Sequence, residues 1–218
     1  MADGRRGPDS RPLLIIMLKA PVMGRVKTRL AREIGLAAAT RFARICSRIT
    51  IERLARDRRW HTLLAIAPDN AAGAQIWPAH CRKIGQGRGD LGARMGRLLG
   101  PAFRPALLIG ADIPGVSPAI IADAFALLRR SDIVLGPAED GGYWLIGMNR
   151  GAPRVVQFHG VRWSTPHALA DTVECFPTSR IGFAAALGDV DDAESYRRHA
   201  ALAGCVTLTK LRIRRAWL

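Results

Sequence analysis

Leu13–Leu18 is a continuous apolar run, and it constrains the fold more than any other stretch of the sequence. A run without polar alternation is typical of a strand buried on both faces of a mainly parallel sheet. His61–Ala67 and Ala106–Asp112 have the same character, and the second ends on an acid. A long stretch with helical spacing, Gly35–Arg58, lies between the first two strands. Strands that alternate with helices predict an α/β protein with a doubly wound sheet.

The remaining elements complete this prediction. Asp132–Gly136 and Tyr143–Gly147 are close enough in sequence to pair antiparallel, so we expect a mixed, mainly parallel sheet in a three-layer arrangement. A short strand is expected near Arg82–Gly85. Further helices are expected in the glycine-rich region after Gly92, at 117–130, after Thr165 and at 192–203. In the helix Gly35–Arg58, the residues predicted to form the apolar face are Ala38, Phe42, Ile45, Ile49 and Leu54.

The length of 218 residues favours one domain, which we place at residues 12–205. Residues 1–11 are expected to form a flexible tail, and residues 206–218 a basic C-terminal segment. No apolar run approaches the roughly 20 residues that span a bilayer, and no cleavage site follows the first apolar run, so a cytoplasmic protein is predicted. The four cysteines are scattered singly, without the spacing of a zinc site. Nothing in the sequence indicates an oligomeric state.

The net charge of +15 points to an anionic partner but does not identify it. Nucleic acid, an anionic membrane surface and anionic small substrates all fit such a charge. The positive residues are spread along the chain rather than gathered in one low-complexity tail. The motifs must therefore decide between these partners.

A basic loop, Lys19–Arg29, directly follows the first strand. In open α/β sheets, ligands bind outside the carboxyl ends of the strands, so this loop is a candidate anion site. Its residues Gly24, Arg25, Lys27 and Thr28 combine close backbone approach with positive charge. A P-loop is excluded, because Arg25 and Val26 separate Gly24 from Lys27.

Carboxylates supply the second part of the candidate site. Asp112 ends an apolar strand, where it could hold Mg²⁺ or Mn²⁺ that bridges phosphate oxygens, although a turn role before Pro114 would also explain it. Asp189 and Asp191 alternate in an extended segment and would point to the same side. Together with the basic loop, these acids suggest metal-assisted phosphoryl chemistry.

Two further stretches carry both a structural and a functional interpretation. Glu139–Gly142 fits a hairpin turn, and its glycines would also admit a substrate while Asp140 orients or activates a hydroxyl. Trp163-Ser164-Thr165 fits a helix start with a packed aromatic as well as it fits a binding segment.

Six blocks in order resemble the rSAM/selenodomain-associated transferase proteins, which have a glycosyltransferase-A-type nucleotidyltransferase fold. The resemblance runs from about Leu13 to about Ala203. More distantly, the chain is similar to 2-phospho-L-lactate guanylyltransferase and the molybdenum-cofactor nucleotidyltransferases. The blocks are Lys19–Leu30, Gly89–Gly92, Gly110–Gly115, Gly136–Tyr143, Trp163–Thr165 and Asp189–Asp191.

The resemblance implies a role for each block. The basic loop, with Lys19, Gly24, Arg25, Lys27, Thr28 and Arg29, would hold the nucleotide phosphates, and Asp90 and Gly92 would lie near base and ribose. Asp112, Asp189 and Asp191 would hold one or two divalent ions. Gly141, Gly142, Tyr143, Trp163 and Ser164 would face the acceptor. The catalytic candidates are Lys27 and Arg29, which would stabilise developing charge, and Asp140, which would serve a hydroxyl acceptor.

The leading hypothesis is nucleotidyl transfer to a small phosphorylated or hydroxylated acceptor. Glycosyl transfer from an NDP-sugar is the alternative: it releases a nucleoside diphosphate, whereas nucleotidyl transfer from a triphosphate releases pyrophosphate. A non-enzymatic polyanion binder would explain the charge but not the acids, so no nucleic-acid partner is expected. Loss of catalysis in a nucleotide-binding protein is not favoured, because the acids are present.

Overall fold

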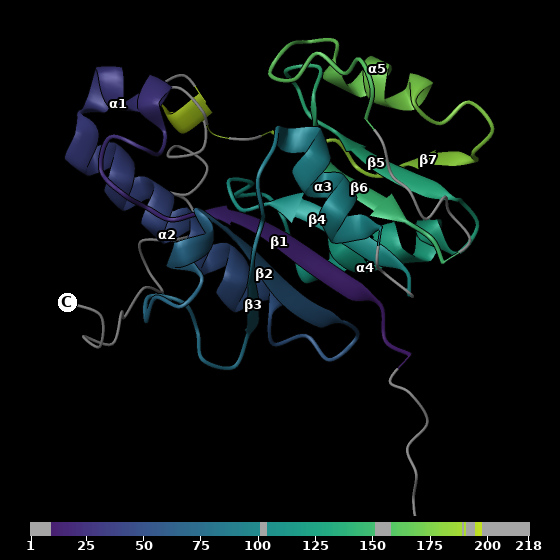
Figure 1. The fold of residues 1–218 in the computed structure, drawn as a ribbon, viewed down its shortest axis with the longest axis horizontal. Coiled ribbons are helices and arrows are strands. Elements are labelled where there is room, and N and C mark those ends of the chain that lie inside the picture. Colours follow the sequence, from purple (N-terminus) through teal and green to yellow (C-terminus); the bar gives the residue numbers. More distant parts are fainter. Residues whose placement is uncertain (1–9, 101–103, 151–157, 189, 191–194, 198–218) are drawn as a thin grey trace, which may run out of the picture.

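The uninterrupted apolar strands form the centre of the sheet. The computed structural model describes residues 10–100, 104–150, 158–188, 190 and 195–197. Within these residues seven strands form one sheet in the order β3-β2-β1-β4-β6-β5-β7 (Figure 1). The strands are β1 (Leu13–Lys19), β2 (His61–Ala67), β3 (Arg82–Gly85), β4 (Ala106–Gly110), β5 (Ile133–Pro137), β6 (Tyr143–Met148) and β7 (Ile181–Phe183). The helices are α1 (Thr28–Ile34), α2 (Leu36–Leu54), α3 (Leu91–Leu99), α4 (Pro118–Leu128) and α5 (Ala168–Glu174), with a 3₁₀ turn η1 (Asp69–Ala71).

The sheet is mixed and mainly parallel, as predicted. β1 pairs in parallel with β2 and with β4, and β2 pairs in parallel with β3. β6 is antiparallel to both β4 and β5, which confirms the pairing expected from the short connection between β5 and β6. In register, Leu13 lies opposite His61 on one side and Ala106 on the other. The carboxyl ends of β1 to β4 therefore meet at one edge, and their amino ends meet at the opposite edge.

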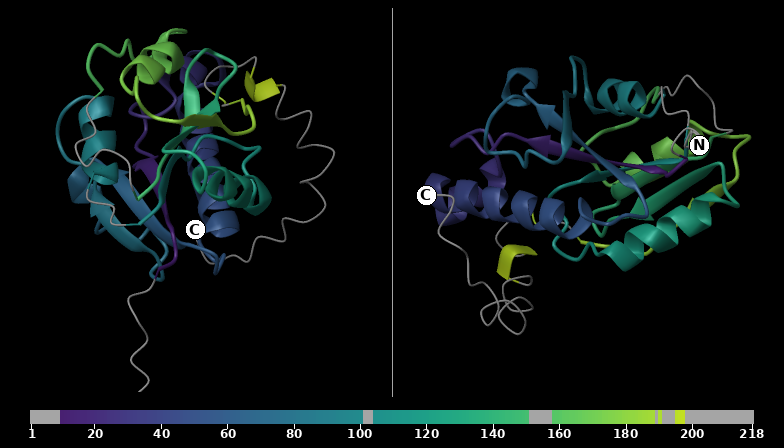
Figure 2. Two further views of the ribbon diagram at one scale, coloured as in Figure 1. Left: turned by 90° about the vertical axis from the view of Figure 1, so that its right-hand side faces the viewer. Right: turned by 90° about the horizontal axis from the view of Figure 1, so that it is seen from below.

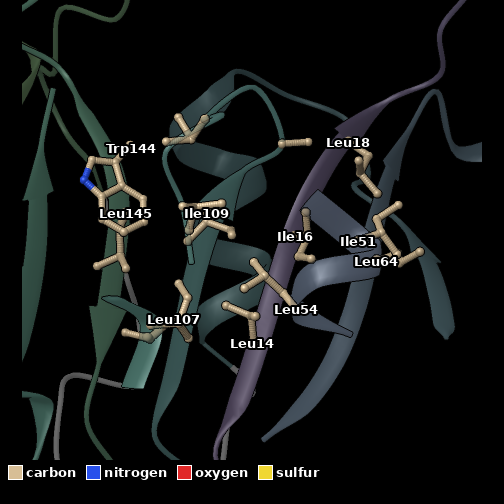
Figure 3. Packing of buried hydrophobic residues seen from close by; sticks show 14 of the residues in the cluster. Leu14, Ile16, Leu18, Ile51, Leu54, Leu64, Leu107, Ile109, Trp144 and Leu145 are labelled. Carbon is tan, nitrogen blue, oxygen red and sulfur yellow. The ribbon is translucent and has the colours of Figure 1, made fainter. Parts of the chain in front are cut away.

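Helices cover both faces of the sheet (Figure 2). Ile51 and Leu54 of α2 pack with the even-numbered side chains of β1 and the odd-numbered side chains of β4, as Figure 3 shows for Leu14, Ile16 and Ile109. α4 belongs to the same apolar cluster. α3 packs on the other face, against Ile15 of β1 and Leu108 of β4, and α5 packs against the same cluster. This is the predicted three-layer α/β architecture, and it holds the strand ends rigidly in place.

The predicted apolar face of α2 is wrong at two of its five positions and only half-buried at two more. Ala38 and Ile45 are exposed, and only Leu54 of the predicted set is fully buried. The buried face consists mainly of small or hydroxyl-bearing residues: Ala39, Thr40, Ala43, Cys46, Ser47, Thr50, Ile51 and Leu54. Small side chains form the part of α2 that is turned inward, and the Thr50 hydroxyl is satisfied because it donates to the carbonyl of Ala111 at 3.1 Å. Hydrophobicity alone therefore selects the wrong face.

Several predicted features lie outside the described residues. These are the tail 1–9, most of the helix expected at 192–203 and the basic segment 206–218. Asp189 and Asp191 also lie outside them, whereas Val190 between these acids is described and buried. The single-domain assignment stays a prediction. Among the described residues no helix has both the length and the apolarity to cross a membrane.

Candidate functional site

A cavity of about 630 Å³ opens at the carboxyl edge of the sheet, and we call it the carboxyl-edge cavity. The loops after β1, β2 and β3 form most of its wall, and α3 adds one arginine. Its volume lies within the roughly 300–1,000 Å³ of small-molecule sites. Its lining residues are Lys19, Ala20, Val22, Arg25, Ala67, Pro68, Asp69, Asn70, Gly87, Arg88 and Arg94.

The basic loop is fastened at both of its ends. The Ala20 N–H donates to the carbonyl of Ala67 at 2.8 Å, which ties the loop to the end of β2. Val26 is buried and anchors the other end. Gly24 between them has φ +77°, in the left-handed region that favours glycine. The loop therefore presents Lys19 and Arg25 to the cavity.

Gln86 organises the wall that follows β3. Its side chain is buried, and its Nε2 donates to the carbonyls of Leu18 at 3.0 Å and Ala65 at 2.9 Å. Arg97 donates to the carbonyl of Gln86 at 2.7 Å and to that of Arg88 at 2.8 Å. These bonds hold the turn that carries Arg88 against two strand ends.

Asp69 joins this turn to the end of β2. Its Oδ1 accepts from the N–H of Gly87 at 2.9 Å. Gly87 has φ +79°, and a Cβ on Gly85 would lie 2.5 Å from the Asp69 carboxyl carbon. Glycine is thus needed for the close approach of the turn to Asp69.

Lys27 and Asp112 form an ion pair beside this cavity. Lys27 Nζ lies 2.9 Å from Asp112 Oδ2; the Lys27 side chain is 4% exposed and that of Asp112 is 44% exposed. Burial together with the negative charge of Asp112 raises the pKa of the Cys46 thiol to about 12, so Cys46 stays protonated at neutral pH. Two residues that the sequence assigns to different roles, phosphate binding and metal binding, are therefore in direct contact.

The structure describes one of the three predicted metal ligands. The N–H of Val190, which stands between Asp189 and Asp191 in the sequence, donates to the carbonyl of Asp112 at 3.4 Å. Within the described residues, no group of three or more histidine, cysteine, aspartate or glutamate side chains could hold a metal. Asp112 offers a half-exposed carboxylate of the kind that binds Mg²⁺. The other two predicted ligands, Asp189 and Asp191, lie outside the described residues.

The turn between β5 and β6 has the hairpin geometry expected of it. Asp140 Oδ1 accepts from the N–H of Gly142 at 2.9 Å, and Gly141 has φ +82°. A Cβ on Gly141 would lie 2.3 Å from the carbonyl oxygen of Pro166. Asp140 itself is exposed. Its role towards a hydroxyl acceptor stays a prediction.

Tyr143 and Trp163 pack in an aromatic cluster with Phe158. The Thr172 hydroxyl donates to Tyr143 Oη at 3.3 Å, and burial raises the pKa of Tyr143 well above its usual value. Packing alone accounts for both residues. Ser164, which follows Trp163, is exposed with φ +60°.

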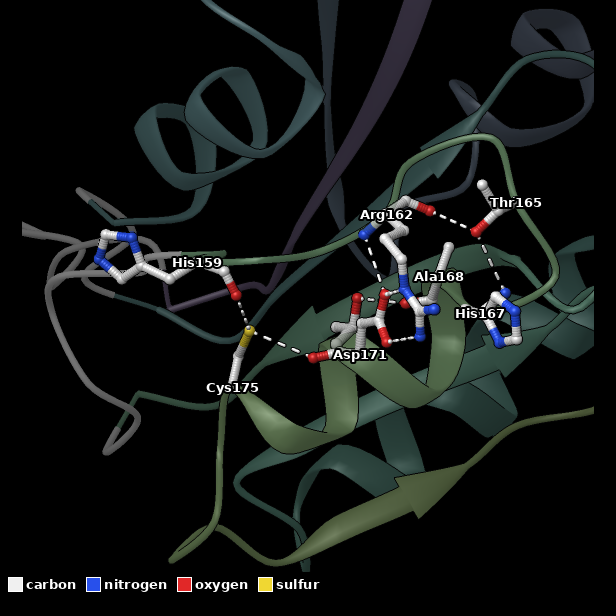
Figure 4. A network of polar contacts seen from close by, with 8 residues as sticks. His159, Arg162, Thr165, His167, Ala168, Asp171 and Cys175 are labelled. Atoms are coloured by element: carbon white, nitrogen blue, oxygen red, sulfur yellow. Dashed lines mark hydrogen bonds and ion pairs between the residues drawn. The ribbon is translucent and has the colours of Figure 1, made fainter.

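A network of hydrogen bonds and an ion pair fixes the segment before α5, as Figure 4 shows. Asp171 accepts from the backbone N–H of Arg162 at 2.9 Å and from its guanidinium at 2.8 and 2.9 Å. The Thr165 hydroxyl donates to the carbonyl of Arg162 at 2.7 Å. This network positions Trp163–Thr165 without any ligand.

The structure does not bring all the predicted nucleotide-binding residues together. Thr28 and Arg29 are exposed on α1 and do not line the cavity. Asp90 caps α3 by accepting from the N–H of Ala93 at 2.8 Å, and Gly92 is packed under Trp163. Structural roles account for these last two residues.

Sequence reasoning missed three charged lining residues: Asp69, Arg88 and Arg94. Each follows the end of a predicted strand or lies on the helix after it. The rule that places ligands at the carboxyl ends of strands could have identified Asp69 and Arg88, had it been applied to β2 and β3 as well.

Comparison with known proteins gives the family. A profile for the DUF2064 family, described as uncharacterized protein conserved in bacteria, matches residues 50–165. The chain belongs to this family. The match includes η1, the Gly87 turn, Asp112 and the β5–β6 turn, so most of the geometry described above lies within the DUF2064 region. No curated protein matches the chain. The narrower resemblance to the rSAM/selenodomain-associated transferases stays a prediction.

Solved structures share the fold. A protein from Desulfovibrio desulfuricans G20, provisionally named a nucleotide-diphospho-sugar transferase, is 27% identical with a TM-score of 0.82, and the match covers 92% of this chain and 91% of that one. A 4-diphosphocytidyl-2C-methyl-D-erythritol synthase from Anaerococcus prevotii DSM 20548 is 12% identical with a TM-score of 0.57, covering 89% and 99% of the two chains. The CMP:2-keto-3-deoxy-manno-octonic acid synthetase complexed with CTP is also 12% identical, with a TM-score of 0.55, covering 90% and 99%. This chain has the nucleotide-diphospho-sugar transferase-like fold.

Proposed function

We propose that this DUF2064 protein is a metal-dependent transferase acting on a nucleotide substrate, by nucleotidyl transfer to a small phosphorylated or hydroxylated acceptor. One observation carries the proposal. Lys19, Arg25, Arg88 and Arg94 line one cavity at the carboxyl edge, and Asp69 is the acid among its lining residues. Such an excess of positive charge in a concave site suits the phosphates of a nucleotide.

The comparisons support the same class of reaction. The Desulfovibrio desulfuricans protein, which matches almost the whole chain, carries the name of a transferase of nucleotide-diphospho-sugars. The two more distant structures share the fold and are named for cytidylyl chemistry, one of them with CTP bound. We infer that the carboxyl-edge cavity takes the nucleotide in this chain as well.

The metal proposal rests on Asp112. Its carboxylate is half exposed, and its backbone carbonyl accepts from the N–H of Val190, which stands between two further aspartates in the sequence. Mg²⁺ or Mn²⁺ held by Asp112, Asp189 and Asp191 would neutralise charge on the phosphates of a bound nucleotide.

The chain's own residues have distinct tasks in this proposal. Lys19 and Arg25 bind and orient the phosphates from the basic loop. Lys27 holds Asp112 in place, and its charge stabilises the negative charge that develops during transfer. Asp140, exposed on the β5–β6 turn, would accept the proton of a hydroxyl acceptor; a phosphate acceptor needs no such base.

Glycosyl transfer is the second candidate. The name of the Desulfovibrio desulfuricans protein favours it, because a nucleotide-diphospho-sugar is the donor in glycosyl transfer. The same cavity would bind the diphosphate, and the leaving group would be a nucleoside diphosphate rather than pyrophosphate. The identity of the ligand that binds distinguishes the two reactions.

The test is a thermal-shift screen of nucleoside triphosphates and NDP-sugars, each with and without Mg²⁺ or Mn²⁺. A ligand at a hundred times its dissociation constant adds about 2.7 kcal/mol to the free energy of unfolding. We expect one ligand to raise the melting temperature of the wild type only with metal. Asp112→Ala should lose that response relative to its own melting temperature without ligand.

Asp123→Ala is the matched control, because Asp123 is an exposed aspartate on α4 away from the carboxyl-edge cavity. It should keep the full response. A triphosphate that stabilises the wild type and yields pyrophosphate supports nucleotidyl transfer, and an NDP-sugar supports glycosyl transfer. If no nucleotide shifts the melting temperature with any metal while polyanions do, the proposal is wrong.

A further inference from the structure

A second cavity, of about 570 Å³, lies at the opposite, amino edge of the sheet. Leu13 of β1, His61–Leu63 of β2 and Arg82 of β3 contribute to its wall. The loop after α2 and Arg104 before β4 complete it. β2 runs from one cavity to the other, and at about 3.3 Å per residue the four steps from Leu63 to Ala67 separate their walls by about 13 Å.

Five arginines line this cavity, which we call the arginine cavity. They are Arg11, Arg56, Arg58, Arg82 and Arg104, and Asp57 is the acid among the described lining residues. The formal excess is therefore four positive charges. Asp57 is already included in this count, and it neutralises none of the four remaining charges. Its carboxylate is bound at 2.7 and 3.0 Å by the guanidinium of Arg59, which does not line the cavity.

Several of these arginine side chains make few or no polar interactions with the part of the chain that the structure describes. The side chains of Arg56, Arg58 and Arg82 make no hydrogen bond or ion pair there, and Arg104 donates only to the carbonyl of Arg11, at 3.2 Å. Like charges that share a cavity repel one another, so this gathering destabilises the empty site. A bound anion removes that repulsion.

The wall that carries the arginines is held firmly in place. Arg59, beyond binding Asp57, donates to the carbonyl of Pro118 at 3.1 Å and lies over the Trp60 ring at 5.0 Å. Trp60 is buried, and its Nε1 donates to the carbonyl of Leu54 at 3.0 Å. The loop after α2 is therefore fixed from behind, while Arg56 and Arg58 remain exposed.

We propose that the arginine cavity is a second anion site, separate from the carboxyl-edge cavity, and that it binds a small compound bearing a diphosphate. A terminal diphosphate carries about three negative charges near neutral pH, because its inner phosphate has only one ionisable oxygen, and this offsets most of the excess of four. Guanidinium groups match phosphate oxygens with paired N–H donors. The volume accommodates a diphosphate with an attached group, within the usual range for small-ligand sites.

The experiment is isothermal titration with inorganic pyrophosphate, without divalent metal, at low and at physiological salt. The arginine-cavity variant is Arg56→Ala with Arg82→Ala, two exposed side chains without hydrogen bonds or ion pairs among the described residues, so the fold should be retained. The carboxyl-edge variant is Arg25→Ala with Arg88→Ala, two arginines that line the carboxyl-edge cavity. The charge-matched control is Arg129→Ala with Arg130→Ala, two exposed arginines at the end of α4.

We expect the arginine-cavity variant to bind pyrophosphate at the arginine cavity at least tenfold more weakly and to keep any binding that the carboxyl-edge variant abolishes. The carboxyl-edge variant should keep the binding at the arginine cavity, and the control should match the wild type.

Equal binding of pyrophosphate by the wild type and the arginine-cavity variant overturns the proposal. An equal loss in the control also overturns it, because the effect is then one of overall charge. Binding of heparin or RNA without pyrophosphate binding overturns it in favour of a polymer surface. Loss in the carboxyl-edge variant alone also overturns it, because pyrophosphate then binds at the proposed nucleotide site.

Discussion

At the scale of single residues, the Lys27–Asp112 pair is asymmetric. The ammonium group is almost fully buried, whereas the carboxylate is nearly half exposed. A buried charge that loses its partner keeps its desolvation penalty, while an exposed charge can be hydrated instead. The two halves of the pair therefore contribute unequally to stability.

We expect Asp112→Asn to lower the free energy of unfolding by about 1–3 kcal/mol, because it removes an acidic partner at 2.9 Å from a buried ammonium. Lys27→Met should lower it by less, since Asp112 can turn to solvent and the methionine fills a similar volume. Urea denaturation of both variants measures the difference. A larger loss for Lys27→Met than for Asp112→Asn would contradict this account of the pair.

Residue chemistry could be predicted from the sequence more readily than residue contacts. Lys27 and Asp112 were both selected for their positions after strands, and both lie at the carboxyl edge. Their direct pairing could not be predicted, because it depends on how the loop after β1 bends back over β4. Asp90 and Gly92 show the converse, since a cap and a packing contact account for them.

At the scale of elements, the β5–β6 turn is locked against the start of α5. Gly141 has a positive φ, and its Cα faces the backbone of Pro166 so closely that a Cβ would overlap it. The N–H of Leu169 donates to the carbonyl of Gly141 at 3.1 Å. The turn and the helix therefore act as one unit, which fixes the position of Asp140.

Gly141→Ala and Gly24→Ala separate the two reasons for glycine. Both positions have φ near +80°, but a Cβ on Gly24 meets nothing within 4 Å. Gly24→Ala should cost about 1 kcal/mol of unfolding free energy, from the backbone conformation alone. Gly141→Ala should cost clearly more, because the backbone of Pro166 must also move. Thermal denaturation compares the variants, and equal losses would refute the steric part.

Strands could be predicted from the sequence far better than helix faces. Long apolar runs identify β1, β2 and β4, because these strands are buried on both sides. The apolar face predicted for α2 is wrong in part because alanine, serine and threonine form most of its buried face, while Ile45 faces solvent. β7 has three residues and gave no pattern to detect.

At the scale of the whole molecule, arginine side chains of this strongly positive chain form hydrogen-bonded ion pairs with several of its aspartates. Hydrogen bonds from Arg162 lower the pKa of Asp171 to about 2. Bonds from Arg59 lower the pKa of Asp57, and bonds from Arg180 lower that of Asp132. Protons therefore bind more tightly to these carboxylates in the unfolded chain than in the folded one.

Stability should consequently fall in acid. The contribution of Asp171 is fully present above about pH 4, the usual pKa of an unfolded aspartate, and is lost as the pH falls towards 2. Asp171→Asn should lower the melting temperature at pH 7, and its difference from the wild type should shrink between pH 4 and pH 2. Asp123→Asn is the control, and an equal, pH-independent loss in both variants would contradict the assignment.

The parallel register of β1 and β2 places the two cavities at opposite ends of these strands and fixes which cavity faces outward when the protein is anchored. Leu13 and His61 start these strands at the arginine cavity, and Lys19 and Ala67 end them at the carboxyl-edge cavity. An attachment made at the start of β1 holds the protein by its arginine pole. Immobilised or fused in that way, the chain would present its carboxyl-edge cavity to the bulk solution and turn its arginine cavity towards the support.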